Sequence, residues 1–196
     1  MIYALEERIG DPSLFCGRTE QMTLLMNWVD KIPRKMAKSR ALLGRRKCGK
    51  SAIMQRIFNI LWNQQGKVIP FYFEVQDNGQ WLLDFADEYY RTLISQYLSF
   101  QTRTPLDFGN QAWEMSKLLE MAKKVNNLNV IENIQVFQDY FQAERASAAF
   151  NWAIGTPSRL AGLENVFFLI MIDEIQYTRT IYISIFSFKL IRLPVK

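Results

Sequence analysis

The sequence predicts an α/β fold, with a mostly parallel β-sheet and helices packed against it. Two short apolar runs, 41–43 and 166–172, are followed by a glycine and by two acids, as at the ends of buried strands. Between these runs, apolar side chains recur at spacings of three and four over 53–61 and 81–97, which is typical of amphipathic helices. Strands that alternate with helices favour a parallel sheet.

Length and composition limit the class of protein. The chain has 196 residues, of which 49% are hydrophobic and 22% are charged, and this is enough for one buried core and excludes intrinsic disorder. Histidine is absent, so Ser-His-Asp and Cys-His catalytic systems and imidazole-bound zinc are excluded. The formal charge of +5 permits an anionic partner without requiring one.

The same counts bear on cellular location. Two cysteines, Cys16 and Cys48, are too few for a disulfide framework and fit a reducing compartment. The first 13 residues contain three acids and no apolar core of signal-peptide length. No apolar run approaches the roughly 20 residues that cross a bilayer. We therefore expect a soluble, cytoplasmic protein with no membrane partner.

The strongest motif is GRRKCGKS at 44–51, which matches the phosphate-loop pattern G-x-x-x-x-G-K-[ST]. Gly44 and Gly49 lack a Cβ, so the backbone there can turn its N–H groups toward phosphate oxygens. Lys50 would reach the β and γ phosphates as a point charge, and the Ser51 hydroxyl would ligate Mg²⁺. The helix that follows would add the positive potential of its N-terminus.

The predicted nucleotide-binding residues also include the variable loop positions and the residue that follows Ser51. These are Arg45, Arg46, Lys47, Cys48 and Ala52. The loop lies in a basic part of the chain, because eleven Lys and Arg residues and no acid occur between Asp30 and Glu74. This excess raises the local positive potential and indicates an anionic ligand. A solvated basic surface is the alternative interpretation of the variable loop positions.

Asp173 and Glu174 end the apolar run 166–172, as expected after a central parallel strand buried on both faces. The carboxyl ends of parallel strands are where ligands bind in open α/β sheets. We expect Asp173 to hold Mg²⁺, directly or through water, and Glu174 to act as general base on the attacking water. With Lys50, Glu174 completes the predicted catalytic pair. The alternative is a pair of acids that only ends a strand.

The remaining elements follow in order along the chain. Residues 67–75 predict a second strand, at an edge because of Pro70, and 81–99 predict an amphipathic helix whose aromatic residues belong to the core. Helices are expected over 111–125 and 132–152. Loops are signalled by Thr104, Pro105 and Gly109 and again by Gly155 and Pro157.

The chain resembles the prokaryotic AAA-like and STAND-type ATPases over residues 14 to about 177. The resemblance rests on FCGRTE at 15–20, LLGRRKCGKS at 42–51 and FFLIMIDEIQY at 167–177. It implies a P-loop NTPase three-layer sandwich in which an additional strand separates the two motif strands. It also implies that Phe15, Gly17, Arg18 and Glu20 border the nucleotide, and that ATP and Mg²⁺ are the cofactors.

The resemblance also sets the expected domain limits. Residues 1–177 would form the ATPase domain, with a helical segment at about 105–155, and 178–196 an atypical tail of a truncated domain. The family's polar sensor strand and arginine finger have no counterpart here, so hydrolysis is expected to be impaired. A protein or DNA partner would act through the missing C-terminal region, and the oligomeric state stays open.

Three functions remain open at this point. The first is an ATPase that uses Lys50, Ser51, Asp173 and Glu174. The second is a nucleotide-gated interaction module that binds ATP without hydrolysing it. The third is a basic nucleic-acid-binding protein that uses residues 31–47, although no nucleic-acid-reading motif occurs there.

Overall fold

The computed structural model describes residues 1–9, 12–77, 79–106, 112–180 and 189–192. Its helices in this part of the chain are α1 (Thr19–Val29), α2 (Lys50–Gln64), α3 (Leu82–Thr102), α4 (Met115–Lys124), α5 (Leu128–Gln142) and α6 (Ala146–Glu164). Its strands are β1 (Arg40–Leu43), β2 (Val68–Glu74), β3 (Phe167–Asp173) and β4 (Lys189–Arg192). Short 3-10 helices cover Pro12–Leu14 and Ile175–Thr180. The protein is therefore of the α/β class that the sequence predicts.

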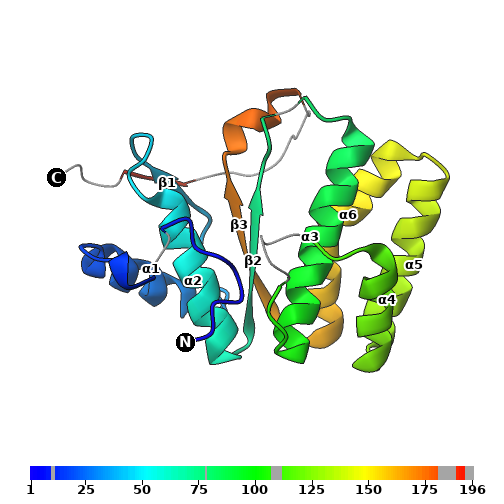
Figure 1. Ribbon diagram of the computed structural model, residues 1–196, viewed down its shortest axis with the longest axis horizontal. Coiled ribbons are helices and arrows are strands. Elements are labelled where there is room, and N and C mark those ends of the chain that lie inside the picture. The colour runs from blue at the N-terminus through cyan, green and yellow to red at the C-terminus, as the bar shows by residue number, and fades with distance from the viewer. Residues whose placement is uncertain (10–11, 78, 107–111, 181–188, 193–196) are drawn as a thin grey trace.

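The helices lie on both sides of the central strands (Figure 1). Helices α1 and α2 occupy one side of the β2–β3 pair, and α3 and α6 occupy the other. Helices α4 and α5 pack outside α3 and α6, where they form an outer helical layer (Figure 1). The helices of the predicted helical segment thus extend one helical side of the fold.

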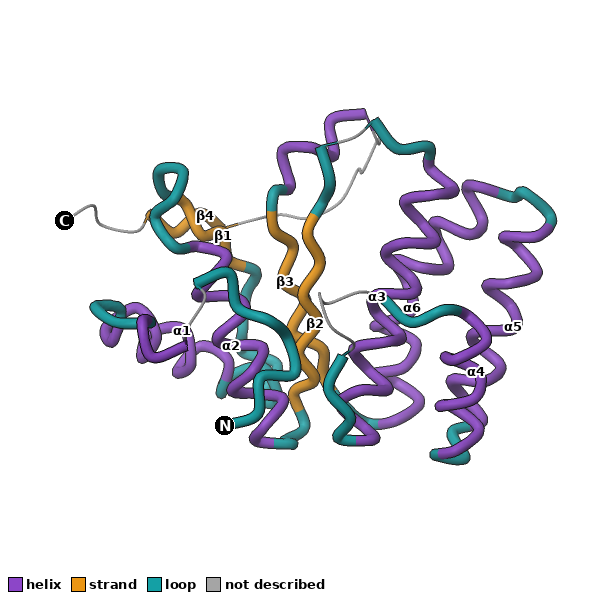
Figure 2. The backbone as a smooth tube through the Cα atoms, viewed as in Figure 1, coloured by secondary structure: helices purple, strands orange, loops and turns teal. Residues whose placement is uncertain are grey.

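All described strand pairs are parallel. Strand β2 pairs with β3 from Val68 opposite Phe167 to Glu74 opposite Asp173. Strand β1 pairs with β4 over Arg40–Leu43, and Figure 2 shows the two pairs as separate units. Among the described residues, no ladder joins β1 to β3 and no strand is hydrogen-bonded between them.

The core extends over both sides of β2, and its aromatic part lies where β2 meets α3. Phe71 and Phe73 of β2 pack edge-on against Tyr89, with ring centroids 5.1 and 5.2 Å apart. Phe85 is also buried, which confirms that the aromatic face of this helix belongs to the core. Trp81 differs, with 82% of its surface exposed, because the helix begins one residue later.

Two helix predictions need correction. The stretch expected as one helix over 132–152 is divided between α5 and α6. Gly155 and Pro157, expected to mark a loop, lie inside α6. Thr156 and Pro157 are buried there, so packing against the rest of the helical layer outweighs the helix-breaking tendency of proline.

Of the two strand predictions, one agrees with the structure and one does not. Strand β2 is hydrogen-bonded on one side only within the described chain, which agrees with the edge position predicted from Pro70. Strand β3 is not buried on both faces as expected, because Ile170 is 42% exposed while Leu169 and Met171 are buried. The face of β3 that carries Asp173 is the buried one, since Asp173 is 5% exposed.

Some expectations concern residues outside the described ranges. Gly109 lies in the gap at 107–111, and most of the expected tail lies in 181–188 and 193–196. The described part of the tail, 189–192, forms β4. No helix in the described ranges is both long and apolar enough to cross a membrane.

Candidate functional site

The loop 44–49 joins β1 to α2 in a conformation that needs a left-handed backbone at Gly49 and leaves no room for a Cβ at Gly44 beside the Cys48 side chain. Gly49 has φ +80°, a left-handed backbone from which α2 begins at Lys50. A Cβ on Gly44 would lie 2.7 Å from Sγ of Cys48, which is closer than such atoms approach. The strand, loop and helix that the motif predicts are therefore all present.

Lys50 places its ammonium group over this loop. Its Nζ donates to the carbonyl oxygens of Gly44 at 3.2 Å and of Arg45 at 3.1 Å. Ser51 and Ala52 follow in the first turn of α2, where backbone N–H groups have no acceptor within the helix. Cation and helix N-terminus together make this end of α2 attractive to an anion.

The box before α1 reaches the same loop. Nη2 of Arg18 donates to the carbonyl oxygen of Cys48 at 2.8 Å. Arg18 is also the N-cap residue of α1, so Thr19 is the first helical residue and not the cap that its type suggests. Phe15 lies near α2 instead, with the Arg56 guanidinium 4.5 Å from its ring centroid.

The two acids lie at the carboxyl end of β3. Oδ1 of Asp173 accepts from the backbone N–H of Glu174 at 3.0 Å, and Oδ2 accepts from the hydroxyl of Tyr72 at 3.1 Å. Glu174 has φ +52°, and its carboxylate accepts from the side-chain amide of Gln176. This left-handed conformation costs a glutamate free energy, but it occurs at seven other described non-glycine residues and so does not by itself mark a site.

One cavity of about 660 Å³ connects the loop with the acids. Gly44, Arg46 and Lys50 line it from the loop side, and Asp173 and Glu174 line it from the end of β3. Its apolar lining includes Ala41, Leu42 and Leu43 of β1, Met54 of α2 and Ile172 of β3. Two parts of the sequence that lie more than 120 residues apart therefore share one cavity.

The other predicted site residues do not line this cavity. They are Arg45, Lys47, Cys48, Gly49, Ser51, Ala52, Gly17, Arg18, Phe15 and Glu20. Arg18 and Cys48 contact each other beside it, and Ser51 and Ala52 occupy the adjoining turn of α2. Glu20 lines a separate surface hollow with Trp28 and Arg40.

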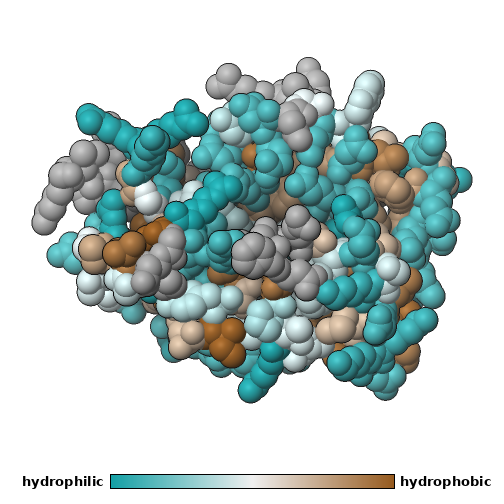
Figure 3. All heavy atoms as spheres, viewed as in Figure 1, coloured by the Kyte–Doolittle hydropathy of each residue, from teal (hydrophilic) through white to brown (hydrophobic). Residues whose placement is uncertain are grey.

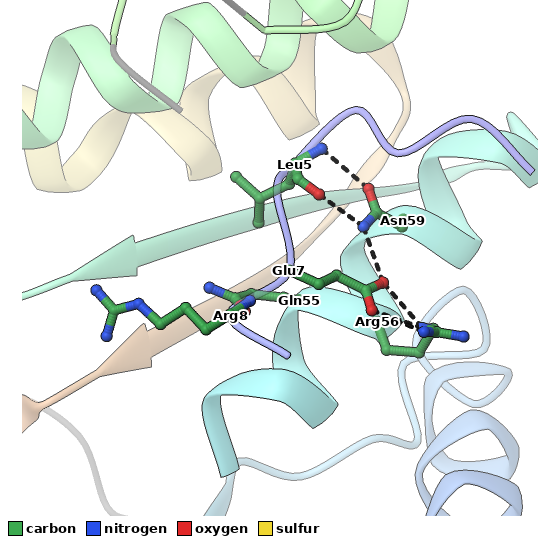
Figure 4. A network of polar contacts seen from close by, with 6 residues as sticks. All are labelled: Leu5, Glu7, Arg8, Gln55, Arg56 and Asn59. Carbon is green, nitrogen blue, oxygen red and sulfur yellow. Dashed lines mark hydrogen bonds and ion pairs between the residues drawn. The ribbon is translucent and has the colours of Figure 1, made fainter. Parts of the chain in front are cut away.

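The N-terminal segment, in which no sequence motif indicates a site, is held along α2 (Figure 4). The backbone N–H groups of Leu5 and Arg8 donate to side-chain oxygens of Asn59 and Gln55, each at 2.9 Å. The buried carboxylate of Glu7 accepts from Arg56 at 2.7–3.0 Å and from Asn59 at 3.0 Å. The amide side chains at positions 55, 59 and 63, four residues apart, are the signal that could have indicated this contact.

The N-terminal segment also places the positive charge of Arg8 near the acids at the carboxyl ends of β2 and β3. The guanidinium of Arg8 forms an ion pair with Glu74, the residue opposite Asp173 in the β2–β3 register. Burial, and then the nearby charge of Asp173, raise the pKa of Tyr72, so this phenol keeps its proton and acts as a donor. Tyr72, Glu74 and Arg8 are thus site neighbours that sequence motifs did not indicate.

The segment 31–47, which ends within this loop, is strongly basic. Seven cationic residues there are exposed: Lys31, Arg34, Lys35, Lys38, Arg45, Arg46 and Lys47. None of the seven forms an ion pair with another described residue. Hydrophilic side chains gather at the upper left of Figure 3, over the loop between β1 and α2.

The available ligands suit a hard cation better than a soft one. Within the described ranges, no group of three or more Cys, Asp or Glu side chains is placed to hold a metal by itself. Mg²⁺ in nucleotide sites uses one or two carboxylate or hydroxyl oxygens together with phosphate oxygens and water. Asp173 and Ser51 offer oxygens of that kind. Cys16 and Cys48 are free thiols.

Comparisons with known proteins add no relative. No family model matches the chain, and neither the curated proteins nor the solved structures contain a significant match.

Proposed function

We propose that the chain binds a nucleoside triphosphate, ATP, with Mg²⁺ in the 660 Å³ cavity between the 44–51 loop and the end of β3. The observation that carries the proposal is that Lys50 and Asp173 line the same cavity. A cation beside a helix N-terminus favours phosphate, and a carboxylate across the cavity favours the metal that phosphates bring. Neither group alone supports this function.

The chain's own residues would each have a distinct task. Lys50 would move its ammonium group from the carbonyl oxygens of Gly44 and Arg45 to the β and γ phosphates. The N–H groups at the start of α2 would donate to phosphate oxygens, while Ser51 and Asp173 would hold Mg²⁺. Bound Mg²⁺ would neutralise phosphate charge as it develops during transfer.

Hydrolysis would depend on Glu174, the only other acid that lines the cavity in the described chain. Its carboxylate would take the proton of the attacking water. Phosphate release that falls to background in Glu174→Gln would support an ATPase. Equal background release from the parent protein and this variant would instead support a nucleotide-gated module that binds ATP without hydrolysis.

We also propose that the fold is the P-loop NTPase sandwich of the AAA-like and STAND-type ATPases. Parallel strands with helices on both sides support this proposal, as does the contact between Arg18 and the loop. A sandwich of this kind would have a strand between β1 and β3. An experimental structure with β1 hydrogen-bonded directly to β3 would argue against it.

The test of nucleotide binding is a titration with a fluorescent ATP analogue, with and without Mg²⁺. Lys50→Ala should weaken binding by at least about tenfold, because a charge-assisted contact to phosphate is lost. Lys67→Ala, which removes an exposed cation at the amino end of β2, is the matched control and should bind as the parent does. Equal affinity in parent and Lys50→Ala would refute the proposal. A GTP analogue in the same assay determines base preference.

Nucleic-acid binding is a second candidate because seven exposed cations lie within residues 31–47. Such binding would weaken steeply with added salt and would be indifferent to ATP. Labelled DNA that binds Lys50→Ala and the parent equally, with a steep salt dependence, would favour this function. For the ATP-binding function, by contrast, we predict a protein partner, or DNA that is bound in response to ATP.

A further inference from the structure

The β2–β3 register brings three polar side chains to one face of the strand pair. Residues opposite one another in parallel strands point to the same face, and so do residues two apart in one strand. Glu74 lies opposite Asp173, and Tyr72 precedes Glu74 by two residues. The hydroxyl of Tyr72 donates to Oδ2 of Asp173 at 3.1 Å, while both residues are only 5–6% exposed.

Tyr72 is itself held firmly. The side chain of Gln96, 2% exposed on α3, accepts from the backbone N–H of Tyr72 and donates to its carbonyl oxygen, both at 2.8 Å. These two contacts occupy the edge of β2 at this residue and fix the backbone from which the phenol extends. The donor is thus part of a rigid strand, and no loop motion is needed to place it.

Glu74, the acid that neighbours Asp173, has a different partner. Glu74 would bring a second negative charge beside Asp173, yet its carboxylate is paired with Arg8. Arg8 belongs to the N-terminal segment that Asn59 and Gln55 hold along α2. The tyrosine hydroxyl is therefore directed to Asp173, and the backbone N–H of Glu174 occupies the other oxygen.

We propose that Tyr72 is a positioning residue that fixes the carboxylate of Asp173 for the metal of a bound nucleotide. This inference rests on the proposed function. Each oxygen of Asp173 accepts one hydrogen bond from the protein, and a carboxylate oxygen has capacity for a further partner. A carboxylate already held in one orientation loses little freedom when it contributes to a metal site.

The experiment separates metal-dependent from metal-independent binding. ATP affinity is measured in Mg²⁺ and in EDTA for the parent, Tyr72→Phe and Tyr89→Phe. Partners that orient a metal ligand typically affect metal affinity 10- to 100-fold, so Tyr72→Phe should reduce the Mg²⁺-dependent gain in affinity by about tenfold. Its affinity in EDTA should equal that of the parent, which a general loss of structure would not allow.

Tyr89→Phe is the matched control, because Tyr89 is also buried but packs against Phe71 and Phe73, away from Asp173. It should leave both affinities unchanged. Tyr72→Phe in an Asp173→Asn background should cause no further loss of the Mg²⁺-dependent gain, since the residue acts through Asp173. Tyr72→Leu replaces Tyr72→Phe in the same cycle if the phenylalanine variant does not fold.

The outcomes separate this inference from the function on which it rests. A full Mg²⁺-dependent gain in Tyr72→Phe, beside a normal parent, would overturn the role of Tyr72 and leave nucleotide binding intact. An additive loss in the double variant would likewise assign Tyr72 a role independent of Asp173. A parent protein whose ATP affinity ignores Mg²⁺ would overturn the inference together with the proposed metal site.

Discussion

Arg18 donates a 2.8 Å hydrogen bond from Nη2 to the carbonyl oxygen of Cys48, thirty residues further along the chain. Cys48 precedes Gly49, the left-handed residue from which α2 begins. Arg18 thus joins the N-terminus of α1 to the turn that would face phosphate. A change at Arg18 should therefore affect the loop without altering any residue of the loop itself.

Arg18→Met should weaken ATP binding about three- to tenfold. A hydrogen bond from a charged donor contributes about 1.5–3 kcal/mol, and partial exposure of Arg18 reduces that value. The measurement is the same titration with a fluorescent ATP analogue, and Arg34→Met, which changes an exposed arginine, is its control. Identical affinities for the two variants would show that the Arg18 contact is irrelevant to the loop.

Gly44→Ala should disrupt the loop through one identifiable clash. The new Cβ would lie 2.7 Å from Sγ of Cys48, whereas Cβ of Cys48 is 4.0 Å away. Cys48→Ala alone removes only the sulfur and should bind ATP as the parent does. The double variant Gly44→Ala/Cys48→Ala should regain most of the affinity that Gly44→Ala loses.

That rescue distinguishes a steric cause from a conformational one. A double variant as weak as Gly44→Ala would mean that the glycine is needed for its backbone freedom and that the clash with Cys48 contributes little. Gly49→Ala provides the contrast, because nothing lies within 4 Å of a Cβ at Gly49 and φ there is +80°. Changing Cys48 should therefore not rescue Gly49→Ala.

The local part of the site could be predicted from the sequence because its determinants are close together. The spacing of Gly44, Gly49 and Lys50 encodes a strand, a turn and a helix without information from elsewhere in the chain. Asp173 was found for a similar reason, since an apolar run that ends in an acid indicates the end of a strand. That both groups line one cavity needed the structure, because sequence spacing does not report distance in space.

The supporting residues could not be predicted because their roles arise only on packing. In the sequence nothing distinguishes Tyr72 from other aromatic residues of a strand. Only the β2–β3 register shows that it contacts Asp173. Glu7 and Arg8 look like part of a polar terminus until Asn59 and Gln55 hold their segment along α2. The loop predicted from Pro157 was wrong, because tertiary packing keeps this residue inside α6 despite the helix-breaking preference of proline.

The three tyrosines of α3 should make the protein sensitive to alkali. Burial raises the pKa values of Tyr89, Tyr90 and Tyr97 above the ordinary value of 10.0. The folded protein then holds these protons more tightly than the unfolded chain, so the stabilisation is complete below about pH 10 and is lost as the pH rises above it. Urea unfolding at pH 8 and at pH 10.5 to 11 should show a lower free energy of unfolding at the higher pH.

Absorbance of tyrosinate checks the same point directly. The signal from these three residues should appear only together with the loss of helical circular dichroism. Tyr90→Phe, which keeps the ring stacked 3.8 Å from Phe137 but removes one phenol, should reduce the alkaline loss of stability. Complete tyrosine ionisation in a protein that retains its native circular dichroism would contradict the prediction.

Asn59→Leu should destabilise the fold by about 3 kcal/mol. Asn59 is fully buried and bonds both the N–H and the carbonyl of Leu5 as well as the carboxylate of Glu7. Leucine would leave these buried groups without their partner, and each unsatisfied group costs about 1–3 kcal/mol, part of which relaxation recovers. Urea unfolding of the variant against the parent gives the difference in free energy.

Asn63→Leu is the control for this prediction, because Asn63 makes the equivalent contacts to Ile2 from an exposed position. Water can replace those contacts, so its cost should stay below about 1 kcal/mol. The comparison also reports on Arg8, which the same segment brings to Glu74. If Asn59→Leu proved no more destabilising than Asn63→Leu, the N-terminal segment would not be fixed along α2, and the pairing of Arg8 with Glu74 beside Asp173 would lose its structural basis.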